Sequence, residues 1–216
     1  MQSIVVPLRC QPEFDRHAHL AAPQEALAAA VTTPTTLVIA EEETPSPHRF
    51  NRGALLNIGF RRAPPSHTVM FHDVDLVPCD KLWGEYNCPA RAGTVRHLGM
   101  CWDRYASNPQ YLGGVVSMHP ADVERLNGFP STFWGWGGED DAFAVRCRLA
   151  GLSIIRPRQG TYVDQEALPL ADKLTLLRQT GAKCTDKWEQ LALERRGKPR
   201  PGLREVGFSV QRSHCK

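Results

Sequence analysis

The sequence lacks any apolar run that approaches the roughly 20 residues needed to cross a bilayer as a helix. Its beginning does not resemble a secretory signal, because the apolar run from Ile4 to Leu8 is short and no basic residue precedes it. We interpret this run as the first strand of the fold. The sequence therefore predicts no membrane span in this chain.

A strong net charge is also absent. The 26 Lys and Arg residues against 23 Asp and Glu residues leave a formal charge of +3, which is too small to indicate nucleic acid as the main partner. A basic run at 194–201 is interpreted as a solvated loop, with a clamp for a phosphate or an acidic acceptor as the alternative.

The seven cysteines show neither a C-x-x-C pair, which would suggest zinc, nor the regular spacing of a disulfide framework. We expect most of them to be small buried residues or free thiols. Cys79 and Cys88 could pair in an oxidising compartment, and the sequence leaves this open.

What the sequence does contain is an alternation of strand and helix patterns, which predicts an α/β fold with a mostly parallel sheet flanked by helices. Helical spacing continues from about 169 to 194, and a last strand-like run covers 206–210. The expected strands are 3–8, 36–40, 68–72, 113–118 and 152–155, and the expected helices are 13–31, 51–62, 120–126 and 140–150. Between 78 and 110 we expect a long loop region with short strands.

Two acids, Asp73 and Asp75, follow the apolar run that ends at His72. If the strand continues through them, both side chains share one face and repel each other unless a cation lies between them. Carboxylates at the carboxyl end of a strand face the ligand crevice of an α/β sheet, and they suit Mg²⁺ or Mn²⁺. The pair alone is a weak signal, because solvated acids at the start of a loop are more common.

A second signal is the segment Trp134-Gly135-Trp136-Gly137-Gly138-Glu139-Asp140-Asp141. Its glycines let the backbone approach a ligand closely, tryptophan rings stack on sugars, and carboxylates accept hydrogen bonds from sugar hydroxyls. The dipole of a following helix would explain the three acids. It would not explain the alternation of Trp and Gly, so we interpret this segment as the core of a sugar-binding active site.

Five segments together resemble the β-1,4-galactosyltransferases, a family of inverting glycosyltransferases with the GT-A fold, which is Rossmann-like. They are 4–9, 50–60, 71–75, 111–114 and 127–141, in the family's order. The resemblance implies one GT-A domain over 1–216 that transfers galactose from UDP-galactose to a saccharide acceptor with Mn²⁺, or Mg²⁺ in its place. The segment 169–216 looks unlike the family and would build a different acceptor site or lid.

The resemblance also implies roles for individual residues. Asp140 would be the general base, while Glu139 and Asp141 would orient the donor sugar and the acceptor. Tyr111 matches a tyrosine that favours galactose over N-acetylgalactosamine. The positions implied for the nucleotide sugar are Pro7, Arg9, Phe50, Arg52, Asp73, Val74, Tyr111, Gly114 and Trp136. Those implied for the acceptor are Trp136, Gly137, Gly138 and Asp141.

The metal site departs from the family pattern. Asp75 would bind the metal, but the family's second ligand is a histidine, and no histidine lies between His119 and His214. Asp164 and Glu166 stand in its place with an i, i+2 spacing that would put both on one strand face. Oxygen ligands would suit Mn²⁺ or Mg²⁺. For Asp164 a ligand and a solvated acid are equally supported, and for Glu166 a solvated surface acid is favoured.

A second departure is Gln11, which stands where the family has another arginine, so one uridine or phosphate contact is expected to be weaker or missing. Two alternatives stay open: a transferase that uses UDP-N-acetylgalactosamine or UDP-glucose, and an inactive carbohydrate-binding homologue. The oligomeric state is also open. The compartment would be the cytoplasm for a complete bacterial protein and the Golgi lumen for a truncated eukaryotic catalytic domain.

Overall fold

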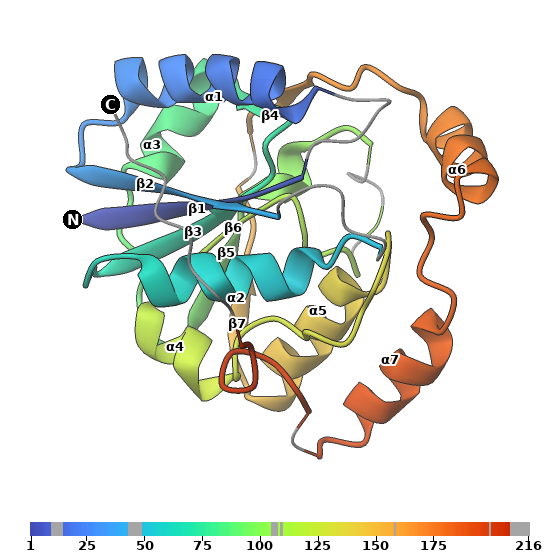
Figure 1. The fold of residues 1–216 in the computed structure, drawn as a ribbon. Coiled ribbons are helices and arrows are strands. Elements are labelled where there is room, and N and C mark those ends of the chain that lie inside the picture. The colour runs from blue at the N-terminus through green and yellow to red at the C-terminus, as the bar shows by residue number, and fades with distance from the viewer. Residues whose placement is uncertain are drawn as a thin grey trace.

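The computed structural model describes residues 1–9, 15–42, 49–104, 108, 110–157, 159–198 and 200–207. A six-stranded sheet forms the centre, in the order β2-β1-β3-β6-β5-β7 (Figure 1). In this order the strands are Thr35–Glu41, Gln2–Leu8, Thr68–His72, Val115–Met118, Thr94–His97 and Ser153–Ile155.

Five of the six strands run in one direction. β1 pairs in parallel with β2 and β3, and β5 pairs in parallel with β7. Only β6 is reversed, because it pairs antiparallel with both β3 and β5. The mostly parallel sheet predicted from the sequence is therefore confirmed. A second, two-stranded sheet joins β4 (Leu76–Pro78) to β8 (Tyr162–Asp164) in antiparallel register.

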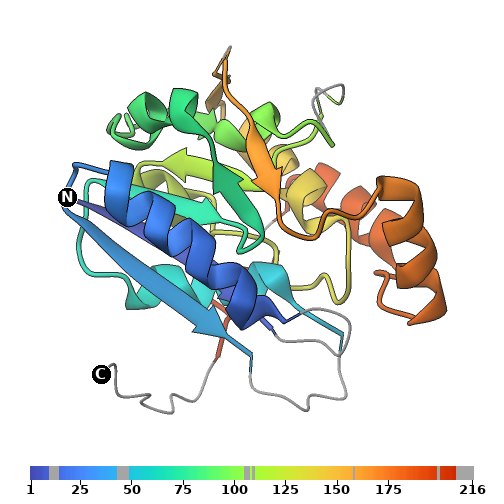
Figure 2. The same ribbon diagram turned by 90° about the horizontal axis from the view of Figure 1, so that it is seen from above.

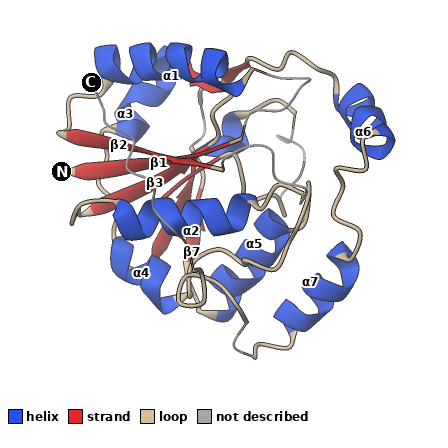
Figure 3. Ribbon diagram, in the orientation of Figure 1, coloured by secondary structure: helices blue, strands red, loops and turns tan. Residues whose placement is uncertain are grey.

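Helices cover both faces of the sheet (Figures 1 and 3). One face carries α1 (Arg16–Ala30) and the short α3 (Trp83–Tyr86), and the other carries α2 (Arg52–Arg62), α4 (Pro120–Arg125) and α5 (Glu139–Leu149). The last two helices, α6 (Leu170–Gln179) and α7 (Lys187–Arg195), follow one another along the side of the molecule toward which β1 points (Figures 1 and 2). Among the described residues, no helix combines the length and apolar character that crossing a bilayer requires.

The central strands are apolar on both faces, which explains the two cores. In β1, Val5 packs into the core beneath α2, α4 and α5, while Ile4, Val6 and Leu8 pack into the core beneath α1. Successive side chains of a strand alternate between faces, so a strand buried on both sides needs the continuous apolar run seen in the sequence.

Several local expectations need correction. The first helix begins at Arg16, where the Asp15 side chain caps it, and residues 10–14 lie outside the described residues. The expected loop at 78–110 contains α3, β5 and two 3₁₀ turns, Asp80–Leu82 and Leu98–Cys101. Val206 and Gly207 form no strand, and 208–210 are not described. The question that the sequence left open for Cys79 and Cys88 is answered, since both are free thiols.

Asn57 ties α2 to the chain that leads into the Trp-Gly segment. Its buried side chain donates from Nδ2 to the Phe129 carbonyl (2.8 Å) and accepts from the Phe129 amide at Oδ1 (2.9 Å). A Cβ at Gly128 would overlap Asn57 Oδ1, so a glycine there makes this approach possible. Two hydrogen bonds thus fix the position of α2 relative to the loop before α5.

We expect Asn57→Ala to lower the free energy of unfolding by roughly 2–4 kcal/mol, because it leaves both backbone groups of Phe129 buried without partners. Urea unfolding followed by circular dichroism measures this. Glu25→Ala, at an exposed position on α1, is the control and should change the free energy by less than about 0.5 kcal/mol. Equal values for the two variants would contradict the structural role of Asn57.

Candidate active site

Asp73, Val74 and Asp75 lie in a turn, not in a strand as expected. β3 ends at His72, and the backbone then turns into β4, with the Asp73 amide donating to the Gly114 carbonyl (3.0 Å). The two carboxylates therefore do not share one strand face. Asp73 reaches toward α2 and α5, while Asp75 reaches toward α1 and β8.

Arg52, the first residue of α2, gathers three acids around one guanidinium. Its Nη2 lies 2.7 Å from Asp73 Oδ1, and its Nη1 lies 2.9 Å from Asp140 Oδ1 and 3.7 Å from Glu139 Oε1. The side chain is only 13% exposed. Acids from the β3–β4 turn and from the start of α5 are thus joined through a single cation.

The first turn of α2 is built to hold Arg52 in this place. Asn51 caps the helix by accepting from the Ala54 amide (2.9 Å), and its Nδ2 donates to the Ser131 carbonyl (2.9 Å). A Cβ at Gly53 would overlap the Pro130 carbonyl oxygen. Only glycine permits this close contact, so the sequence Asn-Arg-Gly fixes both the cap and the packing beside the arginine.

Burial shifts the ionisation of the whole group. It raises the pKa of Asp140 well above the usual value for aspartate; Glu139, Asp73 and Asp141 add to the rise, and Arg52 opposes it. Burial also raises the pKa values of Glu139 and Asp73, again against Arg52. Burial alone would lower the pKa of Arg52, but the surrounding acids raise it, so it stays charged. A carboxylate with a raised pKa is a better proton acceptor.

Glycines also make room for the Asp140 carboxylate. A Cβ at Gly113 would overlap Asp140 Oδ2 and would lie 2.8 Å from the Tyr111 ring. Gly114 has a φ of +70°, and a Cβ there would lie 3.0 Å from the Tyr111 hydroxyl. Tyr111, Gly114 and Asp140 are therefore neighbours. His97 is fully buried and donates from Nε2 to the Gly113 carbonyl (3.0 Å).

The Trp-Gly segment depends on backbone conformations that favour glycine. Gly135, Gly137 and Gly138 all have positive φ angles, of +100°, +98° and +107°. The Gly135 amide donates to the Phe50 carbonyl (2.8 Å), which ties the segment to the residue two positions before Arg52. Gly138 then caps α5, so its first residues are Glu139 and Asp140.

The segment that carries α6 and α7 docks onto these residues. Trp136 forms a parallel β-bridge with Lys183 and donates its amide to the Ala182 carbonyl (2.8 Å). Lys187, at the start of α7, places Nζ 2.7 Å from Asp141 Oδ2. The divergent segment from residue 169 onward therefore packs beside the acids at the start of α5.

The remaining predicted positions lie near the carboxyl end of β1 and in the turn. Pro7 is buried within β1, and Arg9 follows the strand, 3.6 Å from Glu42. Val74 is buried between the two acids of the turn.

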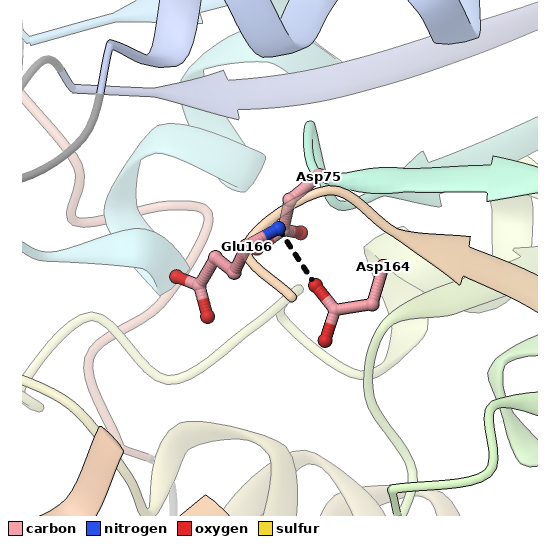
Figure 4. A group of neighbouring side chains, drawn as sticks. All are labelled: Asp75, Asp164 and Glu166. Atoms are coloured by element: carbon pink, nitrogen blue, oxygen red, sulfur yellow. Dashed lines mark hydrogen bonds between the residues drawn. The ribbon is translucent and has the colours of Figure 1, made fainter. Parts of the chain in front are cut away.

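Asp75, Asp164 and Glu166 form a separate cluster, with one oxygen from each carboxylate within 4.8 Å of the others (Figure 4). β8 ends at Asp164, so Glu166 lies in a turn, where its amide donates to Asp164 Oδ1 (3.0 Å). Its side chain is 0% exposed. The expectation that Glu166 is a solvated surface acid is wrong, and so is the shared strand face.

Three cations that the sequence did not indicate surround this cluster. Arg16 contacts Asp75 Oδ2 (3.1 Å) and Glu166 Oε1. Arg104 pairs with Asp164 and lies 3.3 Å from Glu166 Oε2. Lys173 of α6 places Nζ 2.6 Å from the same oxygen.

These cations set the ionisation of Glu166. Burial alone would raise its pKa, but Lys173 and Arg16 lower it to about 2. Burial raises the pKa of Asp164, against Arg104. Three carboxylates and three cations leave the cluster close to neutral. A sequence pattern for it is hard to see, since Arg16 and Glu166 lie 150 positions apart.

Comparison with known proteins gives concordant matches. A family model described as the N-terminal domain of galactosyltransferase matches residues 96–166. β-1,4-Galactosyltransferase 3 of Homo sapiens is 42% identical over 114 residues, which make up 50% of this chain and 28% of that protein. β-1,4-Galactosyltransferase 2 of Cricetulus griseus is 36% identical over 155 residues, or 65% of this chain and 40% of that protein. The matched segments thus span less than half of these relatives.

Solved structures show the same fold. The catalytic domain of Drosophila β-1,4-galactosyltransferase 7, in complex with xylobiose, superposes with a TM-score of 0.77 at 24% identity, covering 99% of this chain and 87% of that one. A mannosyltransferase from Pyrobaculum calidifontis, in complex with GDP-Man and Mn²⁺, gives a TM-score of 0.59 at 14% identity, with 89% and 68% covered. The chain therefore has the GT-A fold, as predicted.

We expect Arg52→Met to lower the free energy of unfolding by about 3–5 kcal/mol at neutral pH, because buried Glu139 and the largely buried Asp73 and Asp140 lose their shared counter-ion. The pKa values of Asp73, Glu139 and Asp140 are already raised in the fold, and they rise further without Arg52. The folded variant then binds protons more readily than the unfolded chain. Its loss of unfolding free energy relative to the wild type should therefore shrink as the pH falls through the pKa values of these three acids.

Urea unfolding at several pH values measures both effects. Arg61→Met, which removes an arginine from the other end of α2, is the matched control and should lack the pH-dependent part. A deficit that stays constant, or that grows on acidification, would contradict the arrangement around Arg52.

Proposed function

We propose that this chain, which belongs to the β-1,4-galactosyltransferase family, transfers galactose from UDP-galactose to a hydroxyl of a saccharide acceptor, with inversion at the anomeric carbon. The observation that carries the proposal is the Arg52 cluster, which holds Asp140 and Glu139 beside Asp73 at the carboxyl end of β3. A mutant of the related Drosophila enzyme has been crystallised with manganese, UDP-Gal and xylobiose, which supports the same classes of ligand here.

Asp140 is the proposed general base. Its carboxylate takes the proton from the acceptor hydroxyl while that oxygen forms a bond to the anomeric carbon. On the opposite face of the sugar, the bond from the anomeric carbon to the diphosphate oxygen breaks, and the electron pair leaves with UDP. One displacement inverts the configuration. Arg52 fixes the direction of this carboxylate through a 2.9 Å contact and limits the rise in its pKa.

Other residues around the cluster have proposed binding roles. Glu139 Oε2 is buried and finds no hydrogen-bond partner in the described part of the chain, so it is free to accept from a donor-sugar hydroxyl. Tyr111, beside Gly113 and Asp140, is proposed to limit the size of the sugar substituent. The proposed acceptor side comprises Trp136, Gly137, Gly138 and Asp141. Pro7, Arg9, Phe50, Asp73 and Val74 are proposed to contact the nucleotide.

Asp75 and Asp164 are the proposed metal ligands. Their oxygen donors fit Mn²⁺ or Mg²⁺, and a bound ion would neutralise charge on the leaving diphosphate. Glu166 has a different proposed role, because three cations contact it, whereas among the described cations Arg16 alone contacts Asp75 and Arg104 alone contacts Asp164. It serves as the counter-ion that keeps these cations from binding the two aspartates more tightly.

We also propose that 1–216 form one catalytic domain that includes the divergent segment. Lys173 and Lys187 bind acids of the two clusters, and Glu194 of α7 pairs with buried Arg146 of α5 (2.8 Å). These contacts bring the segment to both halves of the site. They favour catalysis over the alternative of an inactive sugar-binding homologue, since both clusters are fully assembled.

We expect Asp140→Asn to keep UDP binding and to lower kcat by about 10²–10⁴-fold, because the amide cannot accept the proton. The measurement is UDP release from UDP-galactose with Mn²⁺ and a panel of acceptors, with calorimetry for UDP. In the wild type, kcat should fall on acidification at a higher pH than an ordinary aspartate would give, because the pKa of Asp140 is raised. Full turnover by Asp140→Asn would show that Asp140 is not the general base. Separately, the rates of UDP release from several UDP-sugars would identify the donor.

We expect Asp75→Asn and Asp164→Asn each to weaken Mn²⁺ binding severely, as measured by calorimetry. Glu166→Gln should also weaken Mn²⁺ binding, because Arg16, Arg104 and Lys173 lose their counter-ion and compete with the metal for the two aspartates. Lys173→Met removes one of these cations, so in that background Glu166→Gln should weaken Mn²⁺ binding several-fold less. Lys81→Met, which removes an exposed lysine, is the control background. If Glu166→Gln abolishes binding equally in all backgrounds, Glu166 is a direct ligand and the counter-ion role is wrong.

A further inference from the structure

Trp188, on α7, is the most exposed of the large apolar side chains in the described residues, at 74%. An exposed tryptophan costs free energy relative to burial, and an aromatic face left open to water is typical of a binding surface. Trp188 follows Lys187 directly, and the contacts of Lys187 set an upper limit on the distance from the indole to the proposed active site.

Lys187 links the tryptophan to the acids of α5. Its Nζ lies 2.7 Å from Asp141 Oδ2 and 5.2 Å from the centre of the Trp188 ring. The ring centre therefore lies no more than about 8 Å from the Asp141 carboxylate, the sum of these two distances. Asp141 adjoins Asp140 in the chain, so the indole borders the side of the site proposed for the acceptor.

The helix beneath Trp188 is firmly held. Leu191 is buried in a small apolar cluster with Phe133 and Ala142, and Glu194 binds Arg146. A rigid platform loses little conformational entropy when a ligand binds. Packing therefore fixes α7 while leaving most of the Trp188 side chain exposed.

We propose that Trp188 and Lys187 form an outer acceptor subsite, which binds the second sugar ring of an oligosaccharide whose first ring is held at Asp140 and Asp141. This inference rests on the proposed transferase function. The indole offers an apolar face for the C–H side of a pyranose, and the ammonium group offers hydrogen-bond donors for its hydroxyls. The acceptor class is thus a neutral oligosaccharide in preference to a monosaccharide.

The test compares kcat/KM for a disaccharide with that for its monosaccharide, using xylobiose with xylose and chitobiose with N-acetylglucosamine. Trp188→Ala should lower the ratio of disaccharide to monosaccharide about tenfold, the effect of losing one stacking contact. Trp188→Tyr, which keeps an aromatic face, should recover most of it. Leu149→Ala, at another exposed apolar position (59%), is the control and should keep the wild-type ratio.

Equal losses for both acceptors, or an unaltered ratio, would overturn the subsite. Failure of the transferase proposal is seen separately, as absence of UDP release by the wild type with every donor and acceptor. In that case, calorimetric titration of each disaccharide still tests whether Trp188 contributes to its binding. The subsite requires weaker binding to Trp188→Ala than to the wild type, and equal binding, or no binding to either protein, would refute it.

Discussion

The structure depends on one guanidinium placed among three acids. Without Arg52, the carboxylates of Asp73, Glu139 and Asp140 would meet in a largely buried place, an arrangement that their mutual repulsion and loss of hydration disfavour. The capped first turn of α2 puts the arginine there, and the turn after β3 and the start of α5 bring the acids to it. The same arginine contacts Asp140, the proposed general base.

The second carboxylate cluster is also held together by cations, in this case three of them. Asp75, Asp164 and Glu166 are balanced by cations from α1, from the chain after Cys101, and from α6. Divalent metal binding at this place would have to rearrange existing ion pairs. The divergent segment thus contributes charge to one cluster through Lys173 and to the other through Lys187, so it takes part in both halves of the proposed site.

Much of the fold could be predicted from the sequence, because buried strands such as β1 show continuous apolar runs and α5 begins with acids. The Trp-Gly segment and Asp140 are predicted as a site because their composition is hard to explain by packing, and this stays a prediction. The turn at Asp73–Asp75 and the burial of Glu166 could not be predicted. Glu166 is buried among ion pairs with distant residues such as Arg16, and the turn is held by a hydrogen bond from the Asp73 amide to the distant Gly114 carbonyl. Neither contact leaves a local pattern in the sequence.

The most direct measurement is a crystal structure of the Asp140→Asn variant with UDP-galactose and Mn²⁺. The account predicts that the ion contacts Asp75, Asp164 and the diphosphate, and that Glu166 still binds Lys173. It also predicts that the substituted side chain at position 140 lies on the face of the sugar opposite the diphosphate. A nucleotide sugar bound away from the Arg52 cluster, or the diphosphate on the same face as position 140, would contradict it.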